Sequence, residues 1–201
     1  MTVKEQHEKI VRLVFLAFLI AIVVVLQLFA SAIPLGQTQF SLVLIPIALG
    51  AMILGPMAGG ILGFVFGFIV LMAGITGTDF FTATLFQNAP FITSLLCLGK
   101  STLAGVATGW VYKLLQGKNP FVATVCAAAT TPIVNTGLFA FGALFLKKVL
   151  EANFQPEGSS FLYFLFIIII GINVLVEFGV NLVFSPALVR VVEVIKKQFS
   201  K

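Results

Sequence analysis

The chain has too few charged residues to form a water-soluble domain. Of its 201 residues only 9% are charged, whereas 60% are hydrophobic, and the mean hydropathy is +1.15. Soluble domains typically carry about 25% charged residues. The composition therefore excludes a soluble domain and predicts an integral membrane protein.

Metal ligands and catalytic motifs are also scarce. There is one His, and the two cysteines, Cys97 and Cys126, lie in apolar segments, where a thiol acts as a small packing residue. The sequence has no GxxxxGK[ST] phosphate loop, no Ser/His/Asp arrangement and no HExxH motif. We therefore expect no catalytic residue, no metal and no cofactor in this chain. If such a membrane chain moves a solute, it must use an ion gradient, act as a channel, or depend on ATP hydrolysed by another chain.

Six hydrophobic segments are present, and a helix needs about 20 apolar residues to cross a bilayer. The first begins with charged residues, as signal peptides do, but its longer apolar run predicts a retained helix. Gly55 and Pro56 form a tight turn between the short second segment and the third, which predicts a hairpin. We thus expect an all-α integral membrane bundle of six transmembrane helices in one domain, residues 1–201. The segments cover residues 10–33, 41–55, 57–75, 91–116, 120–147 and 160–190.

The basic residues predict the orientation of this bundle. Lys147 and Lys148 fall on one side, and Lys100 lies within the fourth segment. The positive-inside rule makes the side with the most Lys and Arg cytoplasmic, so both termini are expected in the cytoplasm. The nine basic residues on that side are Lys4, Lys9, Arg12, Lys113, Lys118, Arg190, Lys196, Lys197 and Lys201.

An acid and two amides lie inside the sixth apolar segment. Asn173, Glu177 and Asn181 are spaced four residues apart, which places them on one face of a helix. A carboxylate at bilayer depth costs at least a few kcal/mol unless it is paired or hydrated. The spacing therefore predicts a polar cavity or an ion path.

Two more polar residues occur at membrane depth, Lys100 in the fourth segment and Asn135 in the fifth. Pro132 is expected to interrupt the fifth helix and free backbone carbonyls near Asn135. In one interpretation Lys100 pairs with Glu177 and the amides join helices. In the other, which we favour because helix packing seldom needs five such groups, they face a small polar solute.

The stretch GITGTDFFTATLFQNAP lies between the third and fourth segments. It is too polar for a lipid-facing helix and too aromatic for a plain exposed loop, so we predict a loop that folds over the cavity. Residues 76–88 would open and close the pocket, with Phe80, Phe81 and Phe86 excluding water. Asn88, at the end of this stretch, is a further candidate for binding the solute.

Small residues recur at every fourth position in three segments. Such a stripe lets another helix approach closely. The stripes in the third and fourth segments are expected to pack inside the bundle, whereas the one in the first segment could receive a second protein. The stripes are Ala17 and Ala21, then Gly59, Gly63 and Gly67, and finally Ser101, Gly105 and Gly109.

Along its whole length the chain resembles the S components of energy-coupling factor transporters, which import vitamins in bacteria and archaea. The resemblance rests on LAFLIA with Ala17 and Ala21, on LVLIPIALGAMILGPMAGGILGFVFG, on GKSTLAGVATGWVYKLL, and on TPIVNTGLF. It implies a substrate-binding membrane subunit in the bacterial cytoplasmic membrane. Its implied partners are a transmembrane coupling subunit (T component), which docks on the small-residue face of the first helix, and two cytoplasmic ATPase subunits that use the ATP.

The vitamin is expected to be pantothenate, with riboflavin and folate as alternatives. A small hydrophilic carboxylate suits Lys100 as counter-ion and Asn135, Asn173 and Asn181 as partners for its amide and hydroxyls. A different class is a stand-alone secondary transporter in which Glu177 carries a proton. A scaffold subunit without a ligand is disfavoured by the cluster of buried polar groups.

Overall fold

A computed structural model describes residues 3–31, 34–35, 38–39, 42–117 and 119–199. Almost all of them lie in helices, and a pair of two-residue strands joins the first two helices, with Pro34 opposite Gln39 and Leu35 opposite Thr38. The elements are α1 (Val3–Ser31), β1 (Pro34–Leu35), β2 (Thr38–Gln39), α2 (Leu44–Leu54), α3 (Pro56–Thr76), α4 (Phe80–Asn88), α5 (Pro90–Leu115), α6 (Pro120–Phe145), α7 (Lys147–Phe154), α8 (Phe161–Tyr163), the π-helix η1 (Phe164–Gly171) and α9 (Ile172–Phe199).

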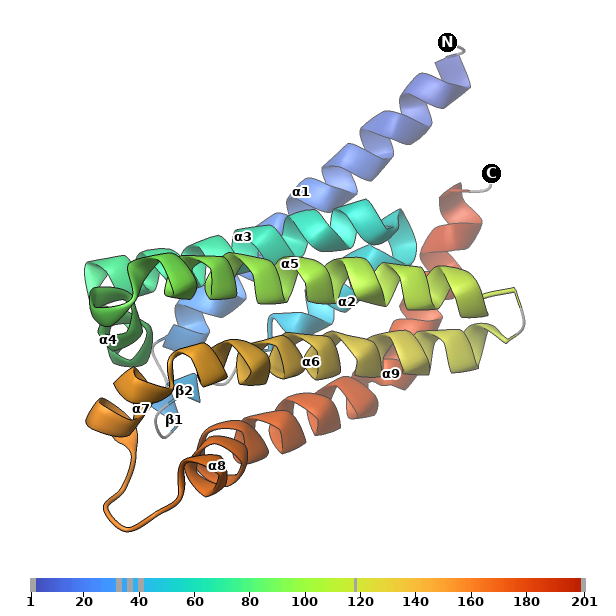
Figure 1. Cartoon of the computed structure of the whole chain (residues 1–201). Helices are drawn as coiled ribbons and strands as arrows, with labels where there is room; N and C mark the ends of the chain where they lie inside the picture. The colour runs from blue at the N-terminus through green and yellow to red at the C-terminus, as the bar shows by residue number, and fades with distance from the viewer. Residues whose placement is uncertain (1–2, 32–33, 36–37, 40–41, 118, 200–201) are drawn as a thin grey trace.

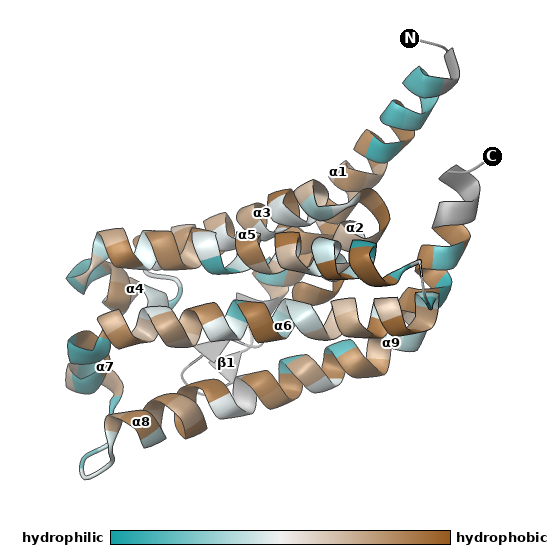
Figure 2. Cartoon of the chain, turned by 45° about the vertical axis from the view of Figure 1, so that its right-hand side comes forward, coloured by the Kyte–Doolittle hydropathy of each residue, from teal (hydrophilic) through white to brown (hydrophobic). Residues whose placement is uncertain are grey.

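The long helices α3, α5, α6 and α9 lie side by side in this order, and α1 leans against α2 and α3 (Figure 1). Both chain ends and the α5–α6 connection lie at one end of the bundle, which we call the terminal end (Figure 1). The short helices α4 and α7 lie at the other end, which we call the α4/α7 end. Hydrophilic residues gather mainly at these two ends and hydrophobic ones between them (Figure 2).

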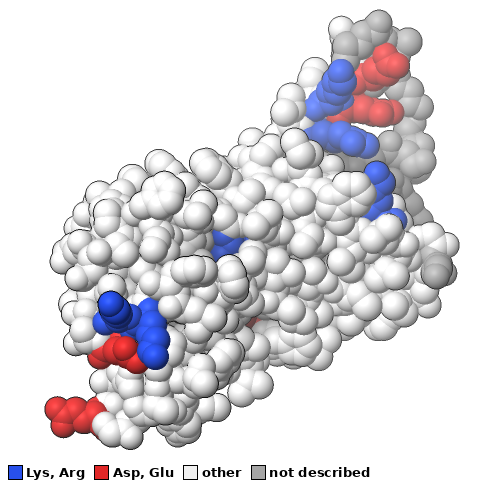
Figure 3. All heavy atoms as spheres, viewed as in Figure 1, with Lys and Arg blue, Asp and Glu red and all other residues white. Residues whose placement is uncertain are grey.

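The predicted all-α membrane bundle is confirmed. In the described part of the chain, five helices are long and apolar enough to cross a membrane, and α2 is a shorter apolar helix. Charged side chains cluster at both ends of the visible face, and the band between them is almost uncharged (Figure 3). This distribution matches a bundle whose middle faces hydrocarbon. Which end faces the cytoplasm stays a prediction from the basic residues.

The predicted hairpin between α2 and α3 is also confirmed. Gly55 adopts a φ of 103°, a conformation that suits glycine, and Pro56 is the first residue of α3. The turn contains no further residue, so α2 and α3 follow each other directly. It fixes where α3 begins its path back through the bundle.

Glycines bring α3 and α5 into direct backbone contact. A Cβ placed on Gly59 would lie 2.4 Å from the carbonyl oxygen of Gly105, and one on Gly67 would lie 2.3 Å from that of Cys97. Real Cβ atoms do not come this close to another backbone. The small-residue stripes of these two helices are therefore used inside the bundle, as the sequence predicts.

Helix α2 is central but fills only part of the bundle. It contacts α1, α3, α5, α6 and α9, and eight of its eleven residues are buried. Its buried Ala48, Met52 and Ile53 pack against Tyr112, Leu188 and other residues near the terminal end. At 1.5 Å per residue α2 is about 16 Å long, about half of a 30 Å hydrocarbon core. The α4/α7 half of the bundle axis is thus left for other side chains or for a cavity.

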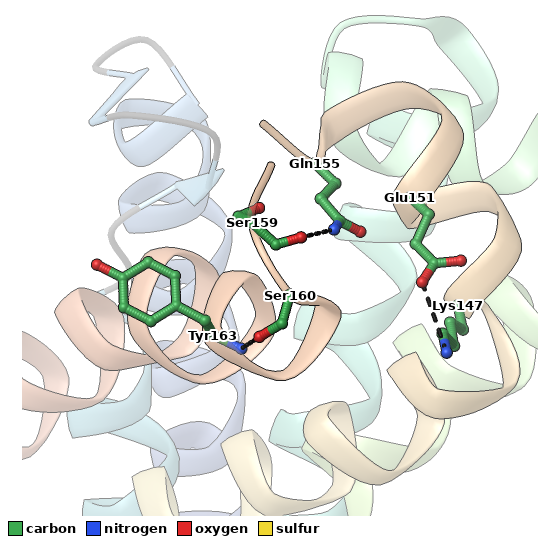
Figure 4. Close-up of polar contacts among 6 residues, drawn as sticks. All are labelled: Lys147, Glu151, Gln155, Ser159, Ser160 and Tyr163. Atoms are coloured by element: carbon green, nitrogen blue, oxygen red, sulfur yellow. Dashed lines mark hydrogen bonds and ion pairs between the residues drawn. The ribbon is translucent and has the colours of Figure 1, made fainter. Parts of the chain in front are cut away.

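The α4/α7 end is held together by short-range contacts. Lys147 Nζ lies 3.5 Å from Glu151 Oε1 within α7, and the amide of Gln155 donates to the backbone oxygen of Ser159 after it (Figure 4). Ser160 Oγ accepts a hydrogen bond from the Tyr163 amide at 3.3 Å and so caps α8 (Figure 4). These contacts fix the connection between α7 and α8.

The prediction of a loop over residues 76–88 is wrong for most of this stretch, because residues 80–88 form α4. Thr84 and Asn88 donate their side-chain hydrogen bonds to backbone oxygens four residues earlier, at 2.9 and 2.8 Å. The polar side chains thus satisfy themselves within the helix. Residues 80–88 can therefore form a helix although their composition is typical of a loop.

Two predicted features of the last two spans also differ. Pro132 does not interrupt α6, which continues from Pro120 to Phe145. The sixth segment is not α-helical throughout, because residues Phe164–Gly171 form η1. A π-helix adds a residue to each turn and changes which side chains face a neighbour, and such elements occur often at functional sites.

Candidate functional site

A cavity occupies the α4/α7 half of the bundle, where α2 does not reach. It is partly open, and its volume is about 110 Å³. Seven elements contribute side chains. The lining residues are Gln27, Phe66, Val70, Asp79, Phe81, Thr82, Leu85, Thr93, Leu96, Cys97, Lys100, Asn135, Thr136, Phe139, Ile169, Ile170 and Glu177.

One basic and two acidic side chains line this cavity. Lys100 comes from the middle of α5, Glu177 from α9, and Asp79 precedes the first residue of α4. Asp79 accepts a hydrogen bond from the hydroxyl of Thr82, at 2.5 Å, which holds its carboxylate at the start of α4. The cavity therefore offers a cationic group and two carboxylates to one occupant.

Lys100 contacts an aromatic ring instead of an acid. Its Nζ lies 5.0 Å from the centre of the Phe139 ring, a cation–π contact. Lys100 and Glu177 line the same cavity but do not form an ion pair closer than 4.0 Å. Glu177 is buried, with 7% of its surface exposed. Both charges are left facing the cavity.

Polar but uncharged groups complete the wall. Asn135 Oδ1 accepts a hydrogen bond from Ser101 Oγ at 3.3 Å, which joins α6 to α5 beside Lys100. Thr93 is fully buried, and its Oγ1 has no hydrogen-bond partner in the described structure. A buried hydroxyl without a partner costs about 1–3 kcal/mol. A polar ligand in this cavity could remove that cost.

The six predicted solute-binding residues do not all lie at the cavity. Lys100, Asn135 and Glu177 line it together. Asn88 is exposed at the end of α4 and is not among the lining residues, and the side chain of Asn173 lies outside the described part of the structure.

Asn181 is buried and also does not line the cavity. Its side-chain nitrogen donates to the backbone oxygen of Glu177 at 2.9 Å, one turn earlier in α9. The spacing of four residues that predicted a common face thus produces a bond within the helix. Asn181 therefore lies one turn after Glu177 in α9 and stabilises the helix turn that carries Glu177.

Sequence reasoning missed several lining residues, among them Gln27, Asp79 and Thr93. Asp79 had a signal, because it is the only acid between Glu8 and Glu151. Gln27 was a polar interruption in the apolar run of α1. Thr93 had none, because a Thr in a membrane helix usually bonds its own backbone.

The two alanines predicted to receive a partner, Ala17 and Ala21, are exposed on α1. They lie four residues apart, and the surrounding exposed residues, such as Phe18 at 59%, are large. Unlike the stripes of α3 and α5, this pair is exposed and is not covered by another described helix. It remains available at the surface of the bundle.

The site can bind and orient a polar molecule, and its chemistry is that of recognition. Among the described residues no three His, Cys, Asp or Glu side chains form a group that could hold a metal ion. The walls combine carboxylate and amide groups with an ammonium group and three Phe rings. Such a mixture of apolar walls and a few polar groups is typical of small-molecule pockets.

Comparison with known proteins agrees with this architecture. Residues 11–189 match the family described as ECF transporter, substrate-specific component. No curated protein matches the chain. The family match covers every residue of the cavity wall and all of the helices except the start of α1 and the end of α9. The chain therefore belongs to the substrate-specific components of ECF transporters, which are substrate-binding membrane subunits of a transporter and not enzymes.

Proposed function

We propose that this subunit takes up one small water-soluble vitamin from outside the cell into the cavity between α4, α5, α6 and α9. It then delivers the vitamin by docking on a transmembrane coupling subunit that two cytoplasmic ATPases drive, in the bacterial cytoplasmic membrane. The observation that carries this proposal is a partly open cavity within a membrane bundle that Lys100, Asp79 and Glu177 line together. ATP serves the partner subunits, and this chain needs no cofactor of its own.

Pantothenate is the proposed vitamin. It has a carboxylate at one end and an amide and two hydroxyls along the rest of a flexible chain. Lys100 has no acid within 4.0 Å among the described residues and would receive the carboxylate. The carboxylates of Asp79 and Glu177 would accept hydrogen bonds from its hydroxyls and its amide N–H, and the Asn135 side-chain NH₂ would donate to its oxygens.

Riboflavin and folate are the alternative ligands. Phe66, Phe81 and Phe139 line the cavity and would stack on a flat ring. Phe139 is already covered by Lys100 on one side. Binding measurements distinguish these ligands. The Kd of the purified protein is measured for pantothenate, riboflavin and folate, and the vitamin with the lowest Kd is identified as the ligand.

A second function has one observation in its favour. Glu177 is buried at membrane depth and does not form an ion pair with Lys100, as expected of a proton carrier in a secondary transporter. That protein would transport alone, and uncouplers would abolish uptake. Our proposal predicts instead that the isolated chain binds its vitamin tightly but transports it repeatedly only with the coupling subunit and ATP.

The experiment begins with mass spectrometry of small molecules that co-purify with the detergent-solubilised protein. Uptake is then measured in proteoliposomes with the chain alone and with the complete complex, with and without ATP and with an uncoupler. Uptake that depends on ATP and the partner subunits supports the proposal. Uptake by the chain alone that the uncoupler abolishes contradicts it and supports the secondary transporter.

A further inference from the structure

Three ring contacts in series connect α7 to the cavity. The ring centres of Phe154 and Phe81 lie 5.0 Å apart, and those of Phe81 and Phe139 lie 6.2 Å apart. The last contact is that of the Lys100 ammonium with the Phe139 ring, at 5.0 Å. The series runs from α7 through α4 and α6 to α5.

Phe154 belongs to this series of contacts but does not line the cavity. Phe81, Phe139 and Lys100 line it, whereas Phe154 does not, and no other residue of α7 does. Phe154 also meets the ring of Phe80 edge to face, with centres 5.9 Å apart, so it packs against both rings at the start of α4. Residues of α7 and α4 thus share one apolar cluster beside the cavity wall.

The orientation of each ring depends on the ring behind it. Phe81 and Phe139 are inclined by 49°, and Phe81 and Phe154 by 45°. A cation is attracted to the face of an aromatic ring and not to its edge. Because interiors are closely packed, a ring that loses its neighbour can turn into the space left. Removing Phe154 would therefore allow Phe81 and then Phe139 to turn and release the ammonium.

We propose that Phe154 is a positioning residue that acts through Phe81 and Phe139 to hold the Lys100 ammonium at the cavity wall. The identity of the anion that meets Lys100 rests on the proposed function, but the position of the ammonium does not. Through Phe154, α7 would then affect the electrostatic potential in the cavity, although none of its residues lines the cavity wall. Any ligand with an anionic group would depend on Phe154 for its charge-dependent affinity.

Cys97 can report this potential without a ligand. It lies three residues before Lys100 in α5 and lines the same cavity. In a Cys126→Ala background, the rates at which Cys97 reacts with a sulfonate-bearing and a trimethylammonium-bearing methanethiosulfonate are measured. A nearby ammonium concentrates the anionic reagent and repels the cationic one, whereas the carboxylates of Asp79 and Glu177 in the same wall act in the opposite sense. Because these carboxylates are present in every variant, a change in the ratio of the two rates reports a change at the ammonium.

We expect Phe154→Ala to lower the anionic-to-cationic ratio about tenfold, toward the value in Lys100→Met. In a Lys100→Met background the same substitution should leave the ratio unchanged. Phe154→Tyr keeps the ring and should restore it. Phe145→Ala removes a ring that is exposed on α6 and paired with Phe141, and it should not change the ratio.

A purely structural role for Phe154 gives a different result. A loosened α7 would speed the reaction of both reagents equally and leave the ratio at the wild-type value, which would overturn the proposal. So would an unreactive Cys97 in the wild type, because Cys97 and Lys100 would then not face an accessible cavity. As a second measurement, Phe154→Ala should weaken binding of pantothenate about tenfold more than that of its alcohol analogue, pantothenol.

The two proposals fail in distinguishable ways. If the wild type binds neither pantothenate nor pantothenol, the proposed vitamin is wrong, while the rate ratio at Cys97 still tests Phe154. If the wild type binds pantothenate but Phe154→Ala weakens both compounds equally, the vitamin stands and the positioning role falls.

Discussion

Gly63 of α3 lies against the backbone of Ser101 in α5, so closely that a Cβ on Gly63 would be 2.1 Å from the Ser101 carbonyl oxygen. The hydroxyl of the same Ser101 donates to Asn135, which lines the cavity. The contact between two helix backbones therefore sets the position of a polar group in the cavity wall. Ser101 thus takes part both in the packing of α3 against α5 and in the hydrogen bonding of the cavity wall.

The first prediction concerns this contact. Gly63→Val should force α3 and α5 apart, because overpacking a close contact costs about 1–3 kcal/mol or more. The midpoint of thermal unfolding in detergent should fall, and ligand affinity should fall with it. Gly137→Val is the matched control, because Gly137 is exposed in α6 with no atom within 4 Å of an added Cβ. Equal midpoints for the two variants would show that α3 and α5 are not closely packed.

The second prediction is that Thr93→Val separates binding from stability. The substitution keeps the shape of the side chain and removes a buried hydroxyl that has no partner in the described structure. Thermal stability should be unchanged or higher, whereas ligand affinity should fall by about 1–3 kcal/mol if the hydroxyl bonds the ligand. Calorimetric titration and thermal unfolding measure the two effects. Unchanged affinity would remove Thr93 from the binding site.

The third prediction is that Lys100→Met discriminates between an acid and its alcohol. Affinity for pantothenate should fall by about 1.5–3 kcal/mol, the contribution of a hydrogen bond to a charged group, while affinity for pantothenol changes little. Binding of both compounds to the purified variant is measured at one pH. Equal losses for both compounds would return Lys100 to a structural role.

The fourth prediction is that α4 closes the cavity when the ligand binds. Phe81, Thr82 and Leu85 of α4 line the cavity, and Gly77 before it adopts a φ of 77° that ends α3. Hydrogen exchange of the amides in residues 78–88 should slow on addition of the ligand. Amides of residues 56–62 in α3, near the terminal end and outside the cavity wall, serve as the internal reference. Equal exchange of 78–88 in both states would make α4 a fixed part of the wall.

The fifth prediction tests docking on a partner. Changing both Ala17 and Ala21 to Trp should leave vitamin binding by the isolated chain nearly intact, because neither residue lines the cavity. ATP-dependent uptake in cells should be abolished, because the bulky rings prevent close approach of a partner helix. A control with Trp at Ile133 and Gly137, exposed positions four residues apart on α6, should transport normally. Normal uptake by the α1 variant would place the docking surface elsewhere.

The membrane bundle could be predicted from the sequence because it depends on local signals. Gly55 and Pro56 marked the α2–α3 turn, and the glycines spaced four apart marked the faces of α3 and α5 that meet. Each signal acts within a few residues of the chain, where periodicity and turn chemistry are direct consequences of backbone geometry.

The cavity could be predicted only in part. Lys100, Asn135 and Glu177 stood out because a polar residue at membrane depth needs a reason. Asn181 did not follow, because its amide bonds the backbone of its own helix. The side chain of Thr93 does not bond its own helix in this way. Its backbone N–H donates to the oxygen of Ala89, as in any helix, while its hydroxyl has no partner in the described structure. Which of two local options a side chain takes depends on neighbours that a single sequence does not reveal.

The short length of α2 has a consequence for how such a binding space can change. The cavity is the part of the bundle axis that an eleven-residue helix does not fill. One more helical turn would extend α2 by about 5.4 Å, and one turn fewer would shorten it by the same distance. An insertion or deletion of a few residues next to Val43 could therefore resize the space for cargo, while the five long helices and their lipid-facing surface stay as they are.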